Sequence, residues 1–420
     1  MTKTLSFITV FFLWFSGLTS ADAIPFESVR EAADPIAAAE AELRLRPHAG
    51  DEVWRALVRG GAPIVRPDPV RTGFVRATFL YRAAANVEEV RLDSILNAVE
   101  VEGRVTDYVR DFTLPLTQIG DSQIWARTLS VPQNSEAVYS FLVRTPAGVR
   151  RHSDGANPRR LRGGDAESVF FANPGSIHPA IRPVPFSSRL TENAFTIDSV
   201  ALERPVFIAA YTHPEAQPRS PVLVIYDSFL WGVRAPAVEI VQNLVARGAI
   251  EPVNVVLIDQ LDMASADNQY RDQLGFLEDE LPTALAERGI LGQRIIAGAS
   301  RRGLVAVMAG LDQPEAVEAV ISLSGSFYWS PDGEAPEWLA RNVAEAREDR
   351  PRFILAAGQL EYVETSTNQG HVMLEANRNM ARALAASDHE VDLIIYQGGH
   401  DVAGWRSALA RALELLFSED

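Results

Sequence analysis

The chain has 420 residues, 47% of them hydrophobic and 22% charged, a composition that indicates a folded protein with a large core and excludes a disordered, coiled-coil or collagen-like chain. Its 55 acidic and 39 basic residues give a net charge of −16, which argues against nucleic acid as a partner. The chain has no cysteine, so disulfides, thiolate metal sites and a cysteine nucleophile are excluded.

Residues 1–23 have the pattern of a secretory signal peptide. Lys3 is followed by an apolar run (5–18) and by an A-x-A cleavage motif (21–23). The run is shorter than the roughly 20 apolar residues that a membrane-spanning helix needs. We therefore expect a mature protein without a membrane span, which is secreted or, in a Gram-negative source, periplasmic.

Two differently patterned segments follow the leader. Residues 24–65 have helical spacing, whereas residues 66–175 contain short runs of alternating apolar and polar residues, such as ATFLYR (77–82). Several short strands separated by turn residues predict an all-β sandwich. A stretch rich in Gly, Pro and Arg (146–190) reads as the connection to the next domain.

Residues 190–420 alternate buried-looking runs with helical patterns. The runs span residues 205–211, 221–227, 254–260, 294–300, 319–325, 352–358 and 391–397. Continuous Val, Ile and Leu runs separated by helices predict an α/β domain with a mostly parallel sheet. Active sites of such sheets lie beyond the carboxyl ends of the strands, so the residues that follow each run are the candidates for chemistry.

The sequence Gly298-Ala299-Ser300 ends one of these runs and precedes a helical pattern. A serine in a sharp strand-to-helix turn is typical of a nucleophile elbow, in which the next backbone N–H, that of Arg301, stabilises an oxyanion. Arg302 occupies the position where the G-x-S-x-G pattern has its second glycine. The alternative interpretation is a chance serine turn.

Glu361 follows the run 352–358, and His400 follows the last run, 391–397. The order Ser, acid, His is that of α/β-hydrolases, in which the histidine takes the serine proton and the carboxylate orients the imidazole. Glu364 is the alternative acid. Surface positions are expected for the other histidines, including His178 and His213.

A second oxyanion donor is expected in the loop after the run 221–227. The backbone N–H groups of Ser228 and Phe229 are the candidates. The sequence has no H-E-x-x-H motif, no phosphate-binding loop and no strand-linked G-x-G-x-x-G. We therefore expect no metal and no cofactor.

The motifs resemble those of the enterochelin (enterobactin) esterase family of the α/β-hydrolase superfamily. They include VLVIYDSFLW (222–231), IIAGASRRGL (295–304), ISLSGSFYW (321–329), LAAGQLE (355–361) and GGHDVAGWR (398–406), together with DEVWRAL (51–57) and IGDSQIWARTL (119–129) in the N-terminal half. The resemblance implies an immunoglobulin-like sandwich before the hydrolase domain. It also implies hydrolysis of ester bonds in ferric catecholate siderophores, with Ser300 as nucleophile, His400 as base and Glu361 as acid.

A ferric tris-catecholate is strongly anionic, so a cationic patch beside the nucleophile is expected. Arg301 and Arg302 are the candidates, with pairing to neighbouring acids as the alternative. Aromatic ring faces for the substrate are expected from Trp231, Tyr328 and Trp329, although such residues also commonly lie in cores.

Two further hypotheses stay open. The family usually has Asp-Gly where this chain has Asp227-Ser228, and the segment 266–275 is shortened. These departures favour a carbohydrate or aryl ester, such as a feruloyl or acetyl ester, as the alternative substrate. Arg302 within the elbow motivates a third hypothesis, a non-catalytic ligand-binding homologue.

Overall fold

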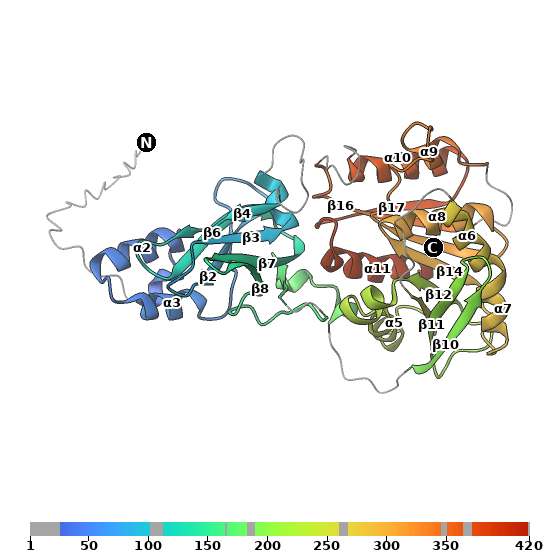
Figure 1. Ribbon diagram of the computed structural model, residues 1–420, viewed down its shortest axis with the longest axis horizontal. Helices are drawn as coiled ribbons and strands as arrows, with labels where there is room; N and C mark the ends of the chain where they lie inside the picture. The colour runs from blue at the N-terminus through green and yellow to red at the C-terminus, as the bar shows by residue number, and fades with distance from the viewer. Residues whose placement is uncertain are drawn as a thin grey trace, which may run out of the picture.

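The structure is a computed structural model. It describes residues 26–100, 112–163, 166–182, 190–259, 268–345, 351–363 and 372–418. The expected signal peptide, residues 1–23, lies outside these ranges. The described chain forms an N-terminal β-rich part and a C-terminal α/β part, which lie side by side along the long axis (Figure 1).

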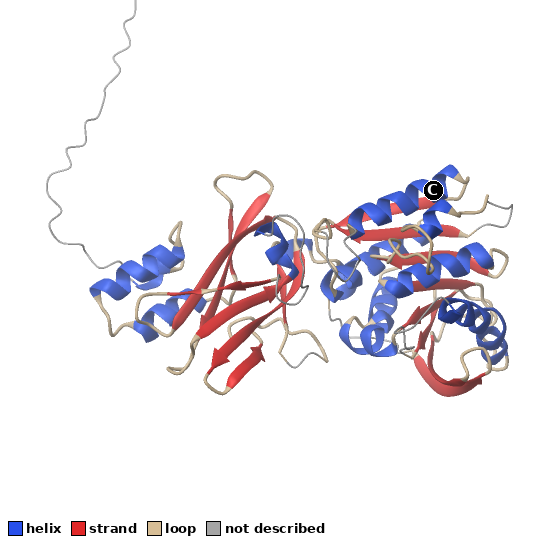
Figure 2. Ribbon diagram, turned by 45° about the horizontal axis from the view of Figure 1, so that its top comes forward, coloured by secondary structure: helices blue, strands red, loops and turns tan. Residues whose placement is uncertain are grey.

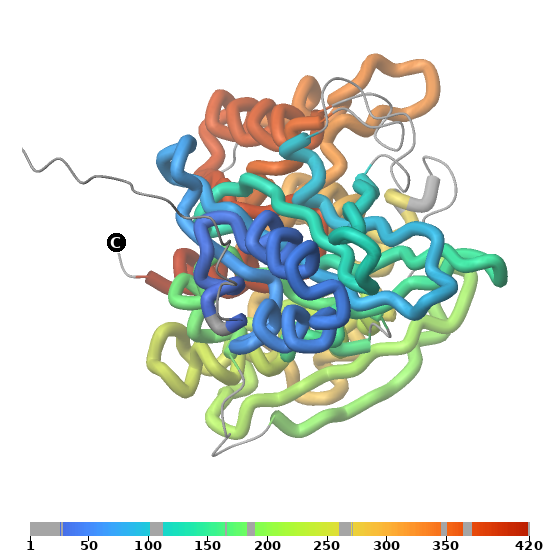
Figure 3. The backbone as a smooth tube through the Cα atoms, turned by 90° about the vertical axis from the view of Figure 1, so that its left-hand side faces the viewer, coloured from blue at the N-terminus to red at the C-terminus, as the bar shows by residue number. Residues whose placement is uncertain are grey.

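Three helices begin the described chain and cover one face of a β-sheet. They are α1 (Phe26–Val29), α2 (Pro35–Leu45) and α3 (Gly50–Val58). Asp34 caps α2, since its side chain accepts hydrogen bonds from the N–H groups of Ile36 and Ala37 at 3.1 Å each. The apolar sides of the helices pack on the sheet in one buried cluster that includes Leu57 and Leu80. In Figure 3 the helices are the foremost elements.

Two antiparallel sheets form the sandwich. The first has the order β1 (Ile64–Pro67), β2 (Phe74–Arg82), β6 (Ile124–Pro132), β5 (Thr117–Gln118), and the second the order β4 (Thr113–Pro115), β3 (Glu89–Ser94), β7 (Glu136–Thr145), β8 (Gly148–His152), with β9 (Ser168–Phe171) also paired to β7. The short helix η1 (Ile95–Glu100) follows β3. Alternation along β2 sends Phe79 into the core between the sheets and Leu80 toward the helices.

The C-terminal part is built on an eight-stranded sheet. Its order is β10 (Thr191–Ser199), β11 (Arg204–Thr212), β13 (Asn254–Ile258), β12 (Val222–Tyr226), β14 (Arg294–Ala299), β15 (Val317–Leu323), β16 (Arg352–Gly358), β17 (Val391–Tyr396). The pairs formed by β10 and β11 are antiparallel, and all the others are parallel. The seven expected runs correspond to β11–β17. The strand β10 was missed because most of its side chains are exposed, so it has no continuous apolar run.

Helices cover both faces of this sheet (Figure 2). One face carries α5 (Ala237–Ala246) and α11 (Val402–Phe417). Three short helices that come before α5 in the chain contribute to the same buried cluster: η2 (Pro174–Ser176), η3 (Pro179–Ile181) and η4 (Leu230–Arg234). The other carries α6 (Asn268–Gly275), η5 (Phe276–Glu280), α7 (Leu281–Ala286), α8 (Arg301–Asp312), α9 (Trp338–Arg341) and α10 (Met373–Ala386). Ile295 and Ile296 on β14 illustrate the result, since they lie in opposite core clusters. The expected α/β-hydrolase domain after an all-β domain is confirmed.

None of the helices that the structure describes is both long enough and apolar enough to cross a lipid bilayer.

Candidate active site

Ser300 lies in a sharp turn between β14 and α8. Its backbone has φ 57° and ψ −125°, a conformation that few non-glycine residues adopt and that is typical of a nucleophile elbow. A Cβ on Gly298 would lie 2.5 Å from the carbonyl carbon of Arg302, and one on Gly303 would lie 2.6 Å from Ser322 Oγ. The strand and helix therefore approach closely because of these two glycines, and the elbow forms with Arg302 between them.

His400 and Glu361 meet Ser300 from two other segments of the chain. His400 follows β17, and its Nε2 lies 3.0 Å from Ser300 Oγ. Glu361 follows β16, and its Oε1 lies 3.1 Å from His400 Nδ1. The carboxylate is buried, with 5% of the residue exposed. Serine, imidazole and carboxylate thus form a continuous hydrogen-bonded chain at the carboxyl ends of three parallel strands.

A second chain of hydrogen bonds supports the loop that carries His400. Trp405 Nε1 donates to Ser324 Oγ at 3.0 Å, and Ser324 Oγ lies 2.7 Å from the Tyr396 hydroxyl. That hydroxyl donates to the Gly399 carbonyl at 3.0 Å. Burial, with the negative charge of Glu361 as a further cause, raises the pKa of Tyr396 well above its usual value, so the phenol stays protonated and keeps donating.

Sequence reasoning missed both Tyr396 and Ser324. The signal that was present is a single hydroxyl-bearing aromatic that directly follows the aliphatic residues 393–395 at the end of β17. A buried phenol requires a hydrogen-bond partner. Because Tyr396 shortly precedes His400 in the sequence, that partner was to be expected near the candidate site.

The sandwich also contacts the loop that carries His400. Asp401 Oδ1 accepts from the N–H groups of Ala403 and Gly404 at the start of α11, at 2.9 and 3.3 Å. Its Oδ2 accepts from the N–H of Val138 on β7 at 2.9 Å. Burial raises the pKa of Asp401 to about 7, and the three backbone donors oppose that shift. The residue after the candidate base is therefore tied to the N-terminal domain.

Contacts from η1 reinforce this attachment. A Cβ on Gly399 would lie 2.1 Å from Ile95 Cγ1, so the loop before His400 lies against η1. The Tyr362 hydroxyl, next to Glu361, donates to the Ala98 carbonyl at 2.7 Å. The loop that carries Glu361 and the loop that carries His400 are thus both packed on the sandwich.

Backbone N–H groups suited to an oxyanion lie at the same edge of the sheet. Arg301 is the first residue of α8, and the backbone N–H groups in the first turn of a helix point toward its N-terminal end. Ser228 and Phe229 follow β12, and Asp227 before them turns the chain with φ 73°. Their roles as oxyanion donors stay predictions.

Trp231 and Arg302, two of the expected substrate contacts, lie in the interior of the domain, and their roles in substrate binding stay predictions. Trp231 is 0% exposed and lies in the core cluster beneath α5 and α11. Arg302 is 8% exposed, donates to Gln273 Oε1 at 3.2 Å and lies over the Tyr226 ring. Both side chains point into the domain because the packed faces of their helices, rather than the neighbouring motifs, decide their direction.

The remaining expected contacts stay open. The Arg301 side chain is exposed. Tyr328 is buried, with 7% exposed, and the half-buried Trp329 packs edge-on against Tyr270 and Trp338. The substrate-binding roles of Arg301, Tyr328 and Trp329 stay predictions.

The surface positions expected for His178 and His213 are wrong. Both are buried, and each ring Nδ1 accepts a hydrogen bond from a backbone N–H two residues further on. They therefore stabilise turns. The alternative acid, Glu364, lies outside the described residues. Within the described ranges no three His, Asp or Glu side chains cluster as a metal site would require.

The sheet order, the strained serine and the order of the three segments define an α/β-hydrolase. The chain belongs to the family described as "Putative esterase", whose model matches residues 199–416. The resemblance inferred from the motifs is confirmed, and the family membership identifies an ester hydrolase.

Similar proteins match nearly the whole chain. The iron(III) enterobactin esterase of Dickeya dadantii is 23% identical over 422 residues, which cover 90% of this chain and 96% of the relative. The iron(III) salmochelin esterase of Escherichia coli O6:H1 is 24% identical over 87% of this chain and 93% of its own. The crystal structure of ferric enterobactin esterase from Salmonella typhimurium shares the fold, with a TM-score of 0.70 at 20% identity over 87% of this chain and 98% of that one. The Shigella flexneri enterobactin esterase, solved in the presence of enterobactin, has a TM-score of 0.66 at 20% identity, covering 83% of this chain and 94% of that one.

Proposed function

We propose that the protein is a serine esterase that hydrolyses the ester bonds of ferric catecholate siderophores. The observation that carries the catalytic part is the hydrogen-bonded chain from Ser300 Oγ through His400 to Glu361. Support for the substrate class comes from the relatives matched over most of their length, which are esterases of iron(III) enterobactin and iron(III) salmochelin.

The first half of the proposed reaction forms an acyl-enzyme. His400 Nε2 takes the proton of Ser300 as Oγ bonds to the ester carbonyl carbon. The carbonyl oxygen becomes an oxyanion, which accepts hydrogen bonds from the N–H of Arg301 and from Ser228 or Phe229. The carbon–oxygen bond to the alcohol then breaks, and the protonated His400 returns its proton to the leaving alkoxide.

The second half releases the acid. A water molecule gives a proton to His400 and bonds to the acyl carbon, and a second oxyanion forms in the same place. Collapse breaks the bond to Ser300 Oγ, which regains its proton from His400. Glu361 remains ionised throughout and stabilises the imidazolium, which forms twice in each turnover.

Incubation with ferric enterobactin, followed by chromatography of linear fragments, tests the proposal. We expect linear products from the wild type and none from Ser300→Ala. If the protein cleaves feruloyl or acetyl esters but leaves the siderophore intact, the substrate class is wrong and the mechanism is retained. If wild type and variant bind ligand equally and neither hydrolyses any ester, the proposed enzymatic activity is wrong and the protein is a binding protein.

We also propose export of the protein after removal of residues 1–23. Expression in a Gram-negative host, followed by N-terminal sequencing of the periplasmic fraction, tests this. A new N-terminus near residue 24 is expected, and a full-length chain confined to the cytoplasm would contradict it.

A further inference from the structure

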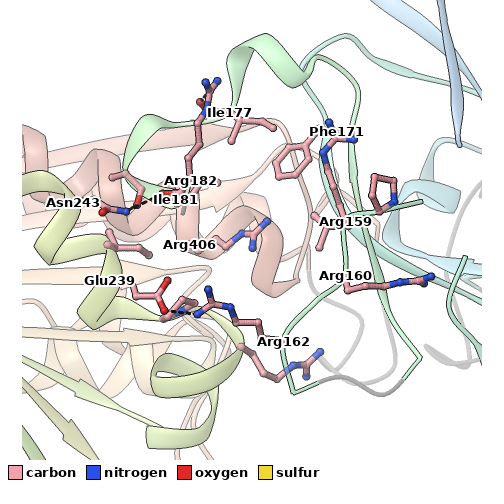
Figure 4. Close-up of a pocket in the computed structure, with 16 residues that line it drawn as sticks. Arg159, Arg160, Arg162, Phe171, Ile177, Ile181, Arg182, Glu239, Asn243 and Arg406 are labelled. Carbon is pink, nitrogen blue, oxygen red and sulfur yellow. Dashed lines mark hydrogen bonds and ion pairs between the residues drawn. The ribbon is translucent and has the colours of Figure 1, made fainter. Parts of the chain in front are cut away.

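A cavity of about 300 Å³ lies away from the candidate triad, at the junction of the two parts of the chain. Its walls come from β9 of the sandwich, from the described segments on either side of β9, and from the end of η4, α5 and α11 of the hydrolase domain. None of Ser300, Glu361 and His400 lines it. Figure 4 shows the Arg406 side chain in the middle of this space, whereas the side chains of Arg160 and Arg182 extend away from it.

The lining is strongly cationic for a protein whose net charge is −16. Six arginines line the cavity together with a single acidic residue, Glu239. Two arginines are neutralised, since Arg162 pairs with Glu239 and Arg234 pairs with Glu167.

The other four arginines are Arg159, Arg160, Arg182 and Arg406, and none has a carboxylate at ion-pair distance among the described residues. Arg160 donates to Ser168 Oγ at 3.0 Å and Arg182 to the Ile177 carbonyl at 3.1 Å. Asp154 acts electrostatically on Arg160, and Glu136 and Asp401 act on Arg406, but none of these carboxylates is at ion-pair distance. Positive charge therefore remains in excess at the cavity, which favours an anion.

Arg406 is the most informative member of the set. It extends from α11 into the cavity, where its guanidinium lies 5.7 Å from the centre of the Phe171 ring. Its Nε is buried and, among the described residues, has no hydrogen-bond partner. Burial lowers the pKa of Arg406, against the charges of Glu136 and Asp401, but a guanidinium remains protonated in proteins. A buried charged donor without a hydrogen-bond partner is unfavourable; a water molecule would satisfy the donor, and an anion would satisfy it and balance the charge as well.

Apart from Asn243, apolar side chains form the rest of the wall. Phe171, Ile181 and Ile240 line the cavity beside the guanidinium groups. The volume is at the lower end of the range for small-molecule sites, and a mainly apolar wall with a few convergent polar groups is their usual composition. A fully hydrated inorganic ion would leave this surface unused.

We infer that this cavity binds a small organic carboxylate whose apolar body contacts Phe171, Ile181 and Ile240 and whose carboxylate accepts from the planar guanidinium of Arg406. The ligand bridges the two domains, because Phe171 belongs to the sandwich and Arg406 to the hydrolase domain. The site is separate from the candidate triad.

Isothermal titration calorimetry of the full chain with benzoate, at low ionic strength and neutral pH, tests the inference. We expect benzoate to bind at least tenfold more tightly than benzamide, its neutral counterpart, and than inorganic phosphate. Equal affinity for benzoate and benzamide would contradict a role for the negative charge of the ligand. Phosphate binding as tight as that of benzoate would contradict a role for the apolar body of the ligand. No heat from any of the three would overturn the site.

Two variants assign the binding to this cavity. Arg406→Gln is expected to weaken benzoate at least tenfold, whereas Arg411→Gln, which removes an exposed charge from the same helix outside the cavity, leaves the affinity within twofold. Arg159→Gln at the exposed rim provides a second probe that does not disturb the interior, with an expected several-fold loss. Unchanged affinity in folded Arg406→Gln and Arg159→Gln would overturn the inference.

Competition separates the cavity from the candidate triad. If a fluorophosphonate labels the protein, saturating benzoate is expected to leave the labelling rate within twofold. Benzoate that blocks labelling equally in the wild type and in Arg406→Gln would place the ligand at the triad and overturn the inference. The calorimetry requires no turnover, so failure of the proposed esterase activity would leave the cavity assignment standing.

Discussion

Replacing Gly399 by alanine probes the contact between the sandwich and the loop that carries the candidate base. A Cβ at this position would lie 2.1 Å from Ile95 Cγ1. Carbon atoms in contact are ordinarily separated by about 3.5–4.0 Å, so Ile95 or the loop must move by about 1.5 Å. Ile95 is buried against the sandwich core and cannot turn freely away. We therefore expect the loop to move and to carry His400 with it.

Movement of this loop also affects the hydrogen bond between His400 and Ser300. His400 Nε2 lies 3.0 Å from Ser300 Oγ, and a displacement of about 1 Å breaks that bond and lowers reactivity by about 10²-fold. The overpacking is also expected to lower the free energy of unfolding by roughly 1–3 kcal/mol. Fluorophosphonate labelling measures reactivity without knowledge of the ester, and urea denaturation measures stability.

A double variant supplies the control. Ile95→Ala removes both γ carbons that the new Cβ would meet, so Gly399→Ala/Ile95→Ala is expected to recover at least tenfold in labelling rate although Ile95→Ala alone costs roughly 2–5 kcal/mol of stability. Gly155→Ala serves as the matched neutral change, because a Cβ there would have no neighbour within 4 Å. Wild-type labelling by folded Gly399→Ala, or no recovery in the double variant, would refute the reasoning.

Three further changes test other parts of the account. Glu361→Gln is expected to lower the labelling rate by about 10³–10⁴-fold while the chain stays folded, because the amide no longer stabilises an imidazolium at His400; a loss below tenfold would argue against Glu361 as the acid. Burial raises the pKa of Asp401 to about 7, so the folded state holds a proton that the unfolded state releases at lower pH. Stability should therefore fall as the pH rises from about 4 to 7, by up to about 1.4 kcal/mol per pH unit. Urea denaturation across this range should lose that component of the slope in Asp401→Asn, and an unchanged slope would contradict it. Trp231→Ala is expected to cost roughly 3–5 kcal/mol of unfolding free energy with little change in KM, since the side chain is 0% exposed; a large rise in KM at unchanged stability would support a substrate contact.

The convergence of the three candidate triad residues could be predicted from the sequence because each of them follows a recognisable strand. Ser300 directly follows β14, and Glu361 and His400 follow within a few residues of the ends of β16 and β17. The carboxyl ends of parallel strands meet at one edge of the sheet. Local pattern and chain order were sufficient to bring these three residues together. The same reasoning placed Ser228 and Phe229 after β12, while their role as oxyanion donors stays a prediction.

Side-chain direction was not accessible in this way. Trp231 and Arg302 lie within the expected motifs, but packing beneath α5 and α11, and over Tyr226, turns them inward. A motif states which residue follows a strand, whereas the neighbouring elements decide which face is buried. Aromatic and arginine side chains near a site are therefore the least reliable sequence predictions here.

Contacts between the two domains were equally hidden. Val138 and Asp401 are 263 residues apart in the chain, yet the N–H of one donates to the carboxylate of the other. No periodicity relates them, because the contact depends on how two separately patterned domains pack. The cationic cavity has the same origin, since its arginines come from the connecting segment and from helices of the second domain.

The central claim is that His400 activates Ser300 as a nucleophile, and mass-spectrometric mapping of a fluorophosphonate adduct tests it most directly. We expect a single adduct on the peptide that contains Ser300, absent from Ser300→Ala and formed at least 10³-fold more slowly in His400→Ala. An unmodified wild type, an adduct on a different serine, or full labelling without the imidazole would contradict the account.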